Sequence, residues 1–273
     1  MLEFFFRTVI SYSSSILPWF FLGIIISYVI EKHIHPKIIG KYFGRASVSK
    51  VILLLILGMI SPLSIMSFLP IVNEFIFLGF NPGMLFSFLL AERAYDLQSF
   101  FIITSLFGFK LAILNGLAIL TSLIVVAYSL RKNHVAFSNS NQRYVNHFFL
   151  RQVKLLVMVV VGIVIGAAIR VIIPPSLFQS FAANPSGGLI SAVVLGFTLY
   201  FGPILGNYPV AKALSELGMS PVGVFGFLTI SPVFNLIVIT LFGTAIGFKS
   251  TIKAVVLYGL TATILTLFFS LLL

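Results

Sequence analysis

Residues 51–79 read VILLLILGMISPLSIMSFLPIVNEFIFLG and contain a single charged residue, Glu74. A run of about 20 apolar residues is long enough to cross a bilayer as a helix. This run is longer than that, and Pro62 and Pro70 flank small and polar residues in its middle. Because proline interrupts a helix, we expect a discontinuous or re-entrant helical hairpin here, inside a membrane.

The rest of the chain has the same apolar character. Uncharged runs also occur at 8–30, 75–91, 111–130 and 254–273, and hydrophobic residues make up 59% of the chain. Charged residues make up only 8%, against about 25% in soluble domains. The runs lack the ten-residue alternation of a membrane β-barrel. The sequence therefore predicts an all-α, multi-pass protein of the cell membrane, with about eight hydrophobic helical segments in the lipid bilayer.

Basic residues gather in two loops, 31–50 and 131–154, and give the chain a net charge of +11. Loops of this kind face the cytoplasm and contact anionic lipid, so we do not expect a nucleic-acid partner. An odd number of crossings cannot separate two cytoplasmic loops, which again requires a hairpin at 51–79. The predicted organisation is a first membrane repeat at 1–130, a basic cytoplasmic linker at 131–154 and a second membrane repeat that follows the linker, at 155–273.

The two halves are related by an internal duplication. A shift of 139 positions aligns PIVNEFIFLGFNPGMLFSFL (70–89) with PVAKALSELGMSPVGVFGFL (209–228), and 7 of the 20 positions are identical. The identities include two prolines and a glycine in register, which exceeds what shared apolar composition would give. With a hairpin in each half, the first helices of the halves point in opposite directions, so we expect an inverted repeat. A parallel duplication with eight spans is the alternative.

Inverted repeats bind their substrates near the middle of the bilayer, where interrupted helices expose backbone dipoles. The sequence contains four candidate interruptions, at 61–70, 89–97, 200–209 and 228–236. The second, LLAERAYDL, holds Glu92, Arg93 and Asp96 in a chain that has only 17 basic and 6 acidic residues. A charge near the bilayer centre costs at least about 2.5 kcal/mol, so these groups are expected to line a cavity or to pair with one another.

Two interpretations of the charged segment remain open. On a helix Glu92 and Asp96 share one face and Arg93 reaches Asp96, an arrangement that would suit a cation, a proton or a polar substrate. The same group would also serve as a salt-bridge network that locks two helices. The shift of 139 positions places Glu92 opposite Ser231 and Asp96 opposite Asn235, so the second half supplies a neutral side to the same site. The candidate substrate-binding or ion-binding residues are Glu92, Arg93, Asp96, Ser64, Asn207, Ser231 and Asn235.

Several activities are excluded by residues that the chain lacks. It has no cysteine, so it forms no disulfide and no thiolate metal site. Asp96 is the only aspartate, so the Tyr95-Asp96 pair cannot complete the aspartate dyad of an intramembrane protease. The motifs of zinc proteases, serine hydrolases and phosphate-binding loops are missing. His33 and His35 lie in a basic loop and are interpreted as interface residues. We therefore predict no catalytic site, no metal and no cofactor.

The segments SPLSIMSFLP, LGFNP and FSFLLAERAYD resemble, in their order and spacing, the predicted permeases of the ArsP and YraQ type. Those proteins typically carry P-x-C-S-C-G-x-x-P and later A-S-P-x-x-N, with a related pattern in the second half. The second half of this chain keeps S-P-x-x-N at Ser231, Pro232 and Asn235. The opening ILPWFFLGIIISYVIEKHIHPKIIGKYFG also resembles the family, so the resemblance spans nearly the whole chain.

The resemblance implies a multi-span permease, and some members of the family export trivalent organoarsenicals through cysteine thiols. Here Ser64 and Met66 stand at the cysteine positions, so this chain cannot capture arsenic with a thiol. We expect a permease or secondary transporter for a small polar or charged solute or ion, with efflux as one direction. The alternative is a non-transporting membrane scaffold or sensor whose intramembrane charges are structural. A homo-oligomer is compatible with either function.

Overall fold

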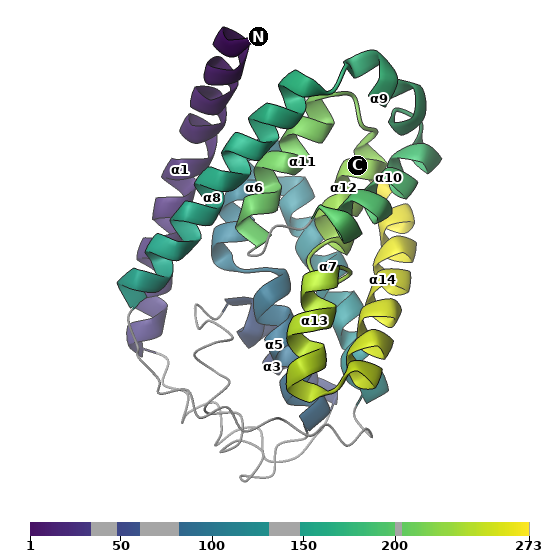
Figure 1. Ribbon diagram of the computed structural model, residues 1–273. Helices are drawn as coiled ribbons and strands as arrows, with labels where there is room; N and C mark the ends of the chain where they lie inside the picture. The colour runs from purple at the N-terminus through teal and green to yellow at the C-terminus, as the bar shows by residue number, and fades with distance from the viewer. Residues whose placement is uncertain (34–47, 61–81, 131–147, 200–203, 273) are drawn as a thin grey trace.

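A computed structural model of the chain describes residues 1–33, 48–60, 82–130, 148–199 and 204–272. Every regular element in these ranges is a helix, as Figure 1 shows. The prediction of an all-α protein is confirmed. The second half of the expected 51–79 hairpin, which includes Ser64, lies outside the described residues.

The helices fall into two groups along the chain. The first group contains α1 (Leu2–His33), α3 (Val48–Ile60), α5 (Pro82–Ala94), α6 (Leu97–Phe107) and α7 (Phe109–Leu130). The second group contains α8 (Phe148–Ile172), α9 (Pro175–Ala182), α10 (Pro185–Thr198), the short 3₁₀ helix η1 (Ile204–Gly206), α11 (Asn207–Glu216), α12 (Pro221–Ile230), α13 (Leu236–Ile246) and α14 (Phe248–Ser270).

Four of the described helices are long and apolar enough to cross a membrane: Leu2–Ile26, Phe109–Leu130, Gln152–Ile172 and Phe248–Ser270. Their outer faces are apolar, which water would not favour but lipid does. On α14, for example, Leu260, Ile264 and Phe268 follow one another at four-residue spacing and are 60%, 65% and 60% exposed. The chain is a multi-pass membrane protein, as the sequence predicts.

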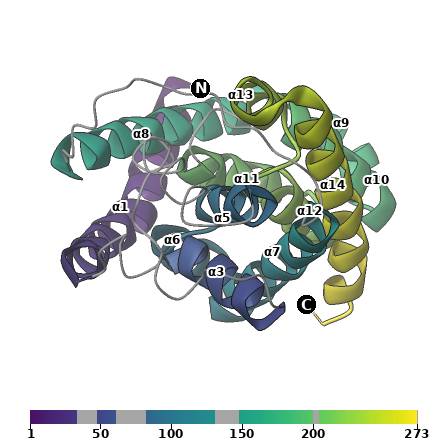
Figure 2. The same ribbon diagram turned by 90° about the horizontal axis from the view of Figure 1, so that it is seen from below.

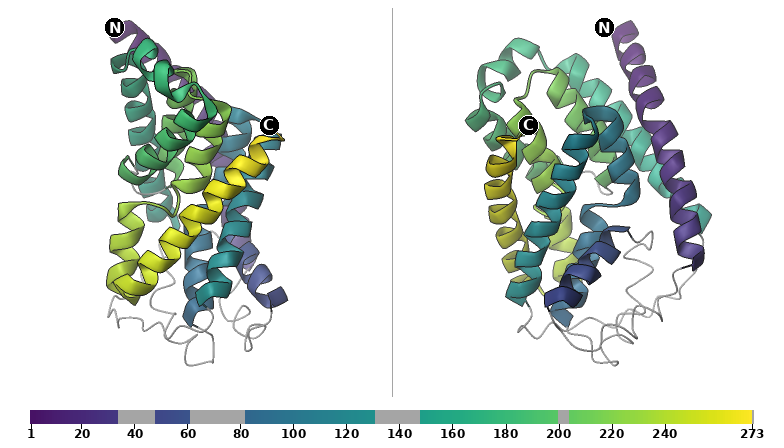
Figure 3. Two further views of the ribbon diagram at one scale, coloured as in Figure 1. Left: turned by 90° about the vertical axis from the view of Figure 1, so that its right-hand side faces the viewer. Right: turned by 180° about the vertical axis from the view of Figure 1, so that it is seen from behind.

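The two ends of the bundle differ in charge. The end of α1, the end of α7, the start of α8 and the junction of α13 with α14 all lie toward one end, which is drawn at the bottom of Figure 1. Lys50, Lys154, Lys249 and Lys253 lie on helices near these points, so we call this the basic end. The chain N-terminus lies at the opposite end, the N-terminal end (Figures 1 and 3).

Two membrane-crossing segments are interrupted in their middle. In the first, α5 stops at Ala94 and α6 starts at Leu97; in the second, α12 stops at Ile230 and α13 starts at Leu236. Both interruptions fall where the sequence predicts them, at 89–97 and 228–236. Viewed from below, α5, α11 and α12 occupy the centre of the bundle, with α1, α8, α14 and α7 around them (Figure 2).

Helix boundaries recur in the two halves at the shift of 139 positions that the sequence alignment uses. Leu97 and Leu236 start α6 and α13, and Gly108 and Gly247 both have φ of 94° and lead directly into α7 and α14. The α6 helix rises to the N-terminal end whereas α13 descends to the basic end, and α7 and α14 pack side by side in opposite directions (Figures 1 and 3). This geometry supports the inverted repeat. The division of the chain into two repeats around the 131–154 linker stays a prediction, because the linker lies largely outside the described residues.

The second half contains a pair of helices that enters the bundle and returns. The α10 helix starts beside α12, because Gly188 packs against Ser220, and α11 ends at Glu216 toward the same end (Figure 1). The α10 and α11 helices therefore run in opposite directions, and α11 starts within the 200–209 interruption that the sequence predicts. The α8 helix packs tightly against η1 and α11, since Gly162 touches Gly206 and Gly166 touches Pro209.

Candidate functional site

Asp96 forms the start of α6. Its backbone is extended, with φ of −139° and ψ of 177°, and its carboxylate accepts the backbone N–H of Ser99 at 2.6 Å. This is an N-cap, and it places a negative charge at the positive end of the helix dipole. The expectation that Glu92 and Asp96 share one helical face is wrong, because α5 ends at Ala94, before Asp96 is reached.

Asn235 occupies the same position in the second half, 139 residues later. Its backbone is also extended, and its Oδ1 accepts the N–H of Val238 at 2.8 Å to cap α13. Its Nδ2 donates to the carbonyl of Ser231 at 2.7 Å and to that of Pro232 at 3.3 Å. The predicted correspondence of Asp96 with Asn235 is therefore a shared capping role, performed by a charged group in one half and a neutral one in the other.

Glu92 and Arg93 lie on the last turn of α5, and both side chains are partly buried and engaged in contacts. The ion pairs among the described residues do not include one between Arg93 and Asp96. The three-residue spacing brings Arg93 and Asp96 together only on a continuous helix, and here the helix is interrupted at Tyr95.

One turn of α7 connects the two interruptions. Tyr95, inside the first interruption, donates its hydroxyl hydrogen to the carbonyl of Ala112 at 2.9 Å. Asn115, one turn further along α7, donates to Oγ1 of Thr229 at 2.9 Å, just before the second interruption. Tyr258 of α14 donates to the Thr229 carbonyl at 2.7 Å. Buried hydrogen bonds thus hold both interruptions against the first two turns of α7.

A cavity of about 370 Å³ adjoins the first interruption. It lies between α3, α7 and the start of α6, and its lining includes Ile60, Tyr95, Asp96, Phe100 and Leu117. Its size is within the range of small-molecule pockets, and its walls are apolar apart from the neighbourhood of Asp96. The interruption that contains Asp96 therefore forms part of the cavity wall.

Some buried polar atoms in this region have no hydrogen-bond partner in the described structure. They are Nδ2 and Oδ1 of Asn207 and Oδ1 of Asn115. Leaving such a group without a partner costs about 1 to 3 kcal/mol. Of these residues, the sequence predicts Asn207 as a site residue, and it begins α11 with 1% of its surface exposed. Polar atoms of this kind are available to a ligand.

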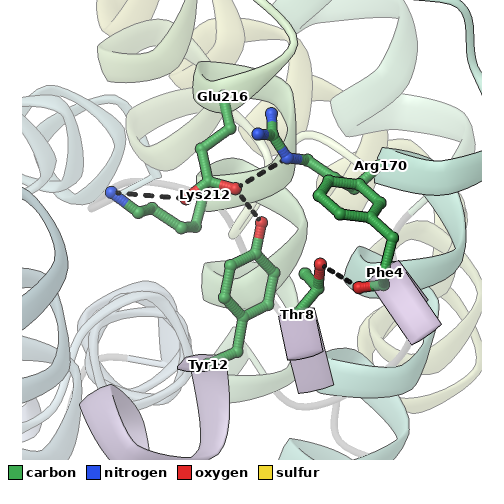
Figure 4. Close-up of polar contacts among 6 residues, drawn as sticks. All are labelled: Phe4, Thr8, Tyr12, Arg170, Lys212 and Glu216. Atoms are coloured by element: carbon green, nitrogen blue, oxygen red, sulfur yellow. Dashed lines mark hydrogen bonds and ion pairs between the residues drawn. The ribbon is translucent and has the colours of Figure 1, made fainter. Parts of the chain in front are cut away.

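A second polar cluster lies at the N-terminal end and is absent from the sequence-based candidates (Figure 4). Glu216 of α11 accepts the hydroxyl hydrogen of Tyr12 at 2.7 Å and pairs with Nε of Arg170 at 3.0 Å. Lys212 lies 3.8 Å away from the other carboxylate oxygen. The guanidinium of Arg170 also sits over the ring of Phe4, 5.7 Å from its centre. The cluster joins α1 of the first half to α8 and α11 of the second.

The sequence offers one weak signal for this cluster. Arg170 is the basic residue in the last turn of the apolar helix α8, a position that usually marks the membrane surface. Tyr12 and Glu216 are 204 residues apart, so nothing in the local sequence indicates that they meet. The same applies to Gln98 and Gln152, whose buried side chains share a hydrogen bond of 3.1 Å between α6 and α8.

Comparison with known proteins agrees with this architecture. Residues 2–132 match the ArsP family, which is described as predicted permease. A Streptococcus mutans (serotype c) protein, described as a predicted subunit of a two-component membrane permease complex, is 23% identical over 245 residues, covering 81% of this chain and 79% of its own length. No solved structure matches the chain. The resemblance to ArsP-type permeases that the motifs indicate is confirmed over the first half.

Proposed function

We propose that this membrane permease, whose first half matches the ArsP-type predicted permeases, carries a small polar or charged solute across the bilayer by secondary transport. The carrier would use the two interrupted segments, α5–α6 and α12–α13, as opposite sides of one central site. Glu92 and Asp96 would handle a proton or a cation, and Arg93 would balance their charge. Efflux is the direction that the family resemblance favours.

The ionisable carboxyl group of Asp96 is the observation that carries this proposal. Asn235 caps α13 in the same geometry without a charge, so capping does not require a carboxylate. A carboxylate inside a membrane is costly, and a protein that could use asparagine here has an energetic reason to do so. The presence of a carboxyl group at position 96 is therefore best explained by a task that asparagine cannot perform, which is binding a cation or exchanging a proton.

Ser231 and Asn235 would form the neutral wall of the site. The Ser231 carbonyl and the Asn235 amide are already hydrogen-bonded to each other, so they are positioned before any solute arrives. Preorganised dipoles of this kind cost no rearrangement on binding. Asn207 and Ser64 belong to the proposed path by their place in the predicted interruptions.

A second protein subunit is part of the proposal. The Streptococcus mutans relative is described as belonging to a two-component complex. We infer that this chain also assembles with another membrane component, and that the pair forms a transporter rather than an enzyme.

The test compares wild type with Asp96→Asn, each reconstituted together with the membrane component that co-purifies with it, in liposomes that contain a pH-sensitive dye. Alkali cations, oxyanions and small zwitterions are added outside, and the internal pH is followed. We expect at least one solute to change the internal pH with wild type and none to do so with Asp96→Asn. Asparagine keeps the cap of α6, so the variant should fold normally. An equal pH change with both proteins would show that transport does not depend on Asp96. The absence of any solute-driven pH change with wild type would favour the scaffold alternative, in which Asp96 is only structural.

A further inference from the structure

Two buried asparagines start helices in the second half, and only one of them has its hydrogen bonds satisfied. Asn235, which is 0% exposed, both donates and accepts hydrogen bonds within its own interruption. Asn207, which is 1% exposed, has no hydrogen-bond partner for either Nδ2 or Oδ1 in the described structure. Buried amides in folded proteins are nearly always paired. The Asn207 amide is therefore available to hydrogen-bond a ligand.

Asn207 lies in a closely packed part of the bundle interior. The 3₁₀ turn η1 runs directly into α11, and α8 and α6 both contact these two elements. Gly162 of α8 lies against Gly206, so the backbone next to Asn207 cannot shift toward α8. The neighbouring Leu205 and Tyr208 are each 1% exposed. Asn207 thus faces the inside of the bundle and not the lipid.

We propose that Asn207 recognises an uncharged, planar group of the solute that both donates and accepts a hydrogen bond, such as an amide or a urea. This inference rests on the proposed function and specifies its substrate class. A primary amide opposite Asn207 forms two antiparallel hydrogen bonds and satisfies both side-chain atoms. A carboxylate would leave Oδ1 facing a negative charge, and an amidinium would leave Nδ2 facing a positive one. Exchanging the positions of Oδ1 and Nδ2 of Asn207 leaves this preference for a neutral amide unchanged.

The first test needs no ligand and compares the two asparagines. Leucine has the same branched shape as asparagine and removes the amide. We expect Asn207→Leu to raise the thermal midpoint of the purified protein, because it removes an unpaired buried amide. The matched variant Asn235→Leu removes a satisfied cap and is expected to lower the midpoint. A drop of similar size in both variants would mean that the Asn207 amide is structural, and it would overturn the proposal.

The second test uses three probes of nearly identical shape: acetamide, acetate and acetamidinium. Saturation-transfer NMR on the detergent-purified protein should detect acetamide more strongly than either ion, and Asn207→Leu should abolish the acetamide signal. Asn207→Asp keeps the side-chain size but turns the donor into an acceptor, so it should shift the preference to acetamidinium. Equal signals from all three probes, or an acetamide signal that Asn207→Leu retains, would overturn the assignment.

The two proposals fail separately. If the amide preference is absent but Asp96→Asn still abolishes the solute-driven pH change, the central ion site stands and the substrate class is wrong. If acetamide binds through Asn207 but Asp96→Asn leaves the pH change intact, recognition stands and the coupling role of Asp96 is wrong.

Discussion

At the scale of the residue, Asp96 caps α6 and is proposed to handle an ion, and its counterpart Asn235 allows us to separate the two roles. Both side chains accept a backbone N–H three residues ahead, at 2.6 and 2.8 Å. The cap depends on an oxygen acceptor, whereas ion handling depends on charge. Two substitutions at one position can therefore test each role alone.

We expect Asp96→Ala to lower the free energy of unfolding by about 1 kcal/mol, because it removes the α6 cap. Asp96→Asn should leave it within about 0.5 kcal/mol of wild type. Chemical unfolding in detergent, followed by tryptophan fluorescence of Trp19, would measure both values. If Asp96→Asn is as unstable as Asp96→Ala, the charge itself stabilises the start of α6.

The hydroxyl of Tyr95 is a second residue with a defined local role. It donates to the Ala112 carbonyl and ties the first interruption to α7. Tyr95→Phe keeps the ring and should cost about 1 kcal/mol of unfolding free energy, since it deletes one buried hydrogen bond. Thr121→Val is a useful control on α7, because it deletes an exposed hydroxyl whose hydrogen bond to the Leu117 carbonyl stays within one helix. A loss of the same size in both variants would show that the effect does not come from the interruption.

At the scale of the element, α8 depends on the absence of a side chain at Gly162. A Cβ at this position would overlap the carbonyl of Gly206, and one at Gly166 would come within 2.7 Å of the carbonyl of Pro209. Small residues are the usual means by which membrane helices approach one another closely. The position of α11, and with it Asn207, is therefore set by α8.

Gly162→Ala is expected to lower the free energy of unfolding by about 1 to 3 kcal/mol, because the added methyl group forces α8 away from η1. The adjacent Val161 is 41% exposed on the lipid-facing side, and Val161→Ala should have little effect. Thermal unfolding of both variants in one detergent gives the comparison. Equal stability of the two would contradict the tight packing of α8 on η1.

At the scale of the whole molecule, the cluster around Glu216 links α1 to the second half. Surface ion pairs contribute little, but here the side chains of Arg170 and Glu216 are only 25% and 29% exposed. Three groups from three helices, Tyr12, Arg170 and Lys212, contact the Glu216 carboxylate, as Figure 4 shows. A movement of α1 against α8 and α11 would have to break these contacts, so they are suited to hold the N-terminal end closed.

A double-mutant cycle tests this link. We expect Tyr12→Phe and Glu216→Gln each to lower stability, with a coupling energy of about 1 kcal/mol between them. Arg7→Gln is the control, since Arg7 pairs with Glu3 at the same end but is 77% exposed and belongs to α1 alone. Purely additive losses for Tyr12 and Glu216 would mean that the contact contributes nothing to the association of the two halves.

The predicted inverted repeat implies opposite accessibility for equivalent residues of the two halves. Phe109 and Phe248 start α7 and α14, lie 139 positions apart and are 63% and 50% exposed. The chain has no cysteine, so Phe109→Cys and Phe248→Cys each introduce a unique label site. An impermeant maleimide added to intact cells should modify the first and not the second, because the basic end faces the cytoplasm. Modification of both would favour the parallel duplication.

Local properties of the sequence determined the membrane class, the helical character and the place of the interruptions. Apolar length, proline and helix-capping side chains act within a few residues, so the breaks near Asp96, Asn207 and Asn235 could be predicted without a fold. The same reasoning placed Glu92 and Asp96 on one helical face. That prediction was wrong, because α5 ends before Asp96, and a residue beyond the end of a helix no longer lies on a face of that helix.

Only the tertiary structure decided which polar groups meet and which stay unpaired. Tyr12 contacts Glu216 across 204 residues, and Asn115 reaches Thr229 across 114. Asn235 has its hydrogen bonds and Asn207 does not, although both are buried asparagines at helix starts. Hydrogen bonding requires atoms to lie about 3 Å apart, and distant segments reach that separation only when the helices are packed.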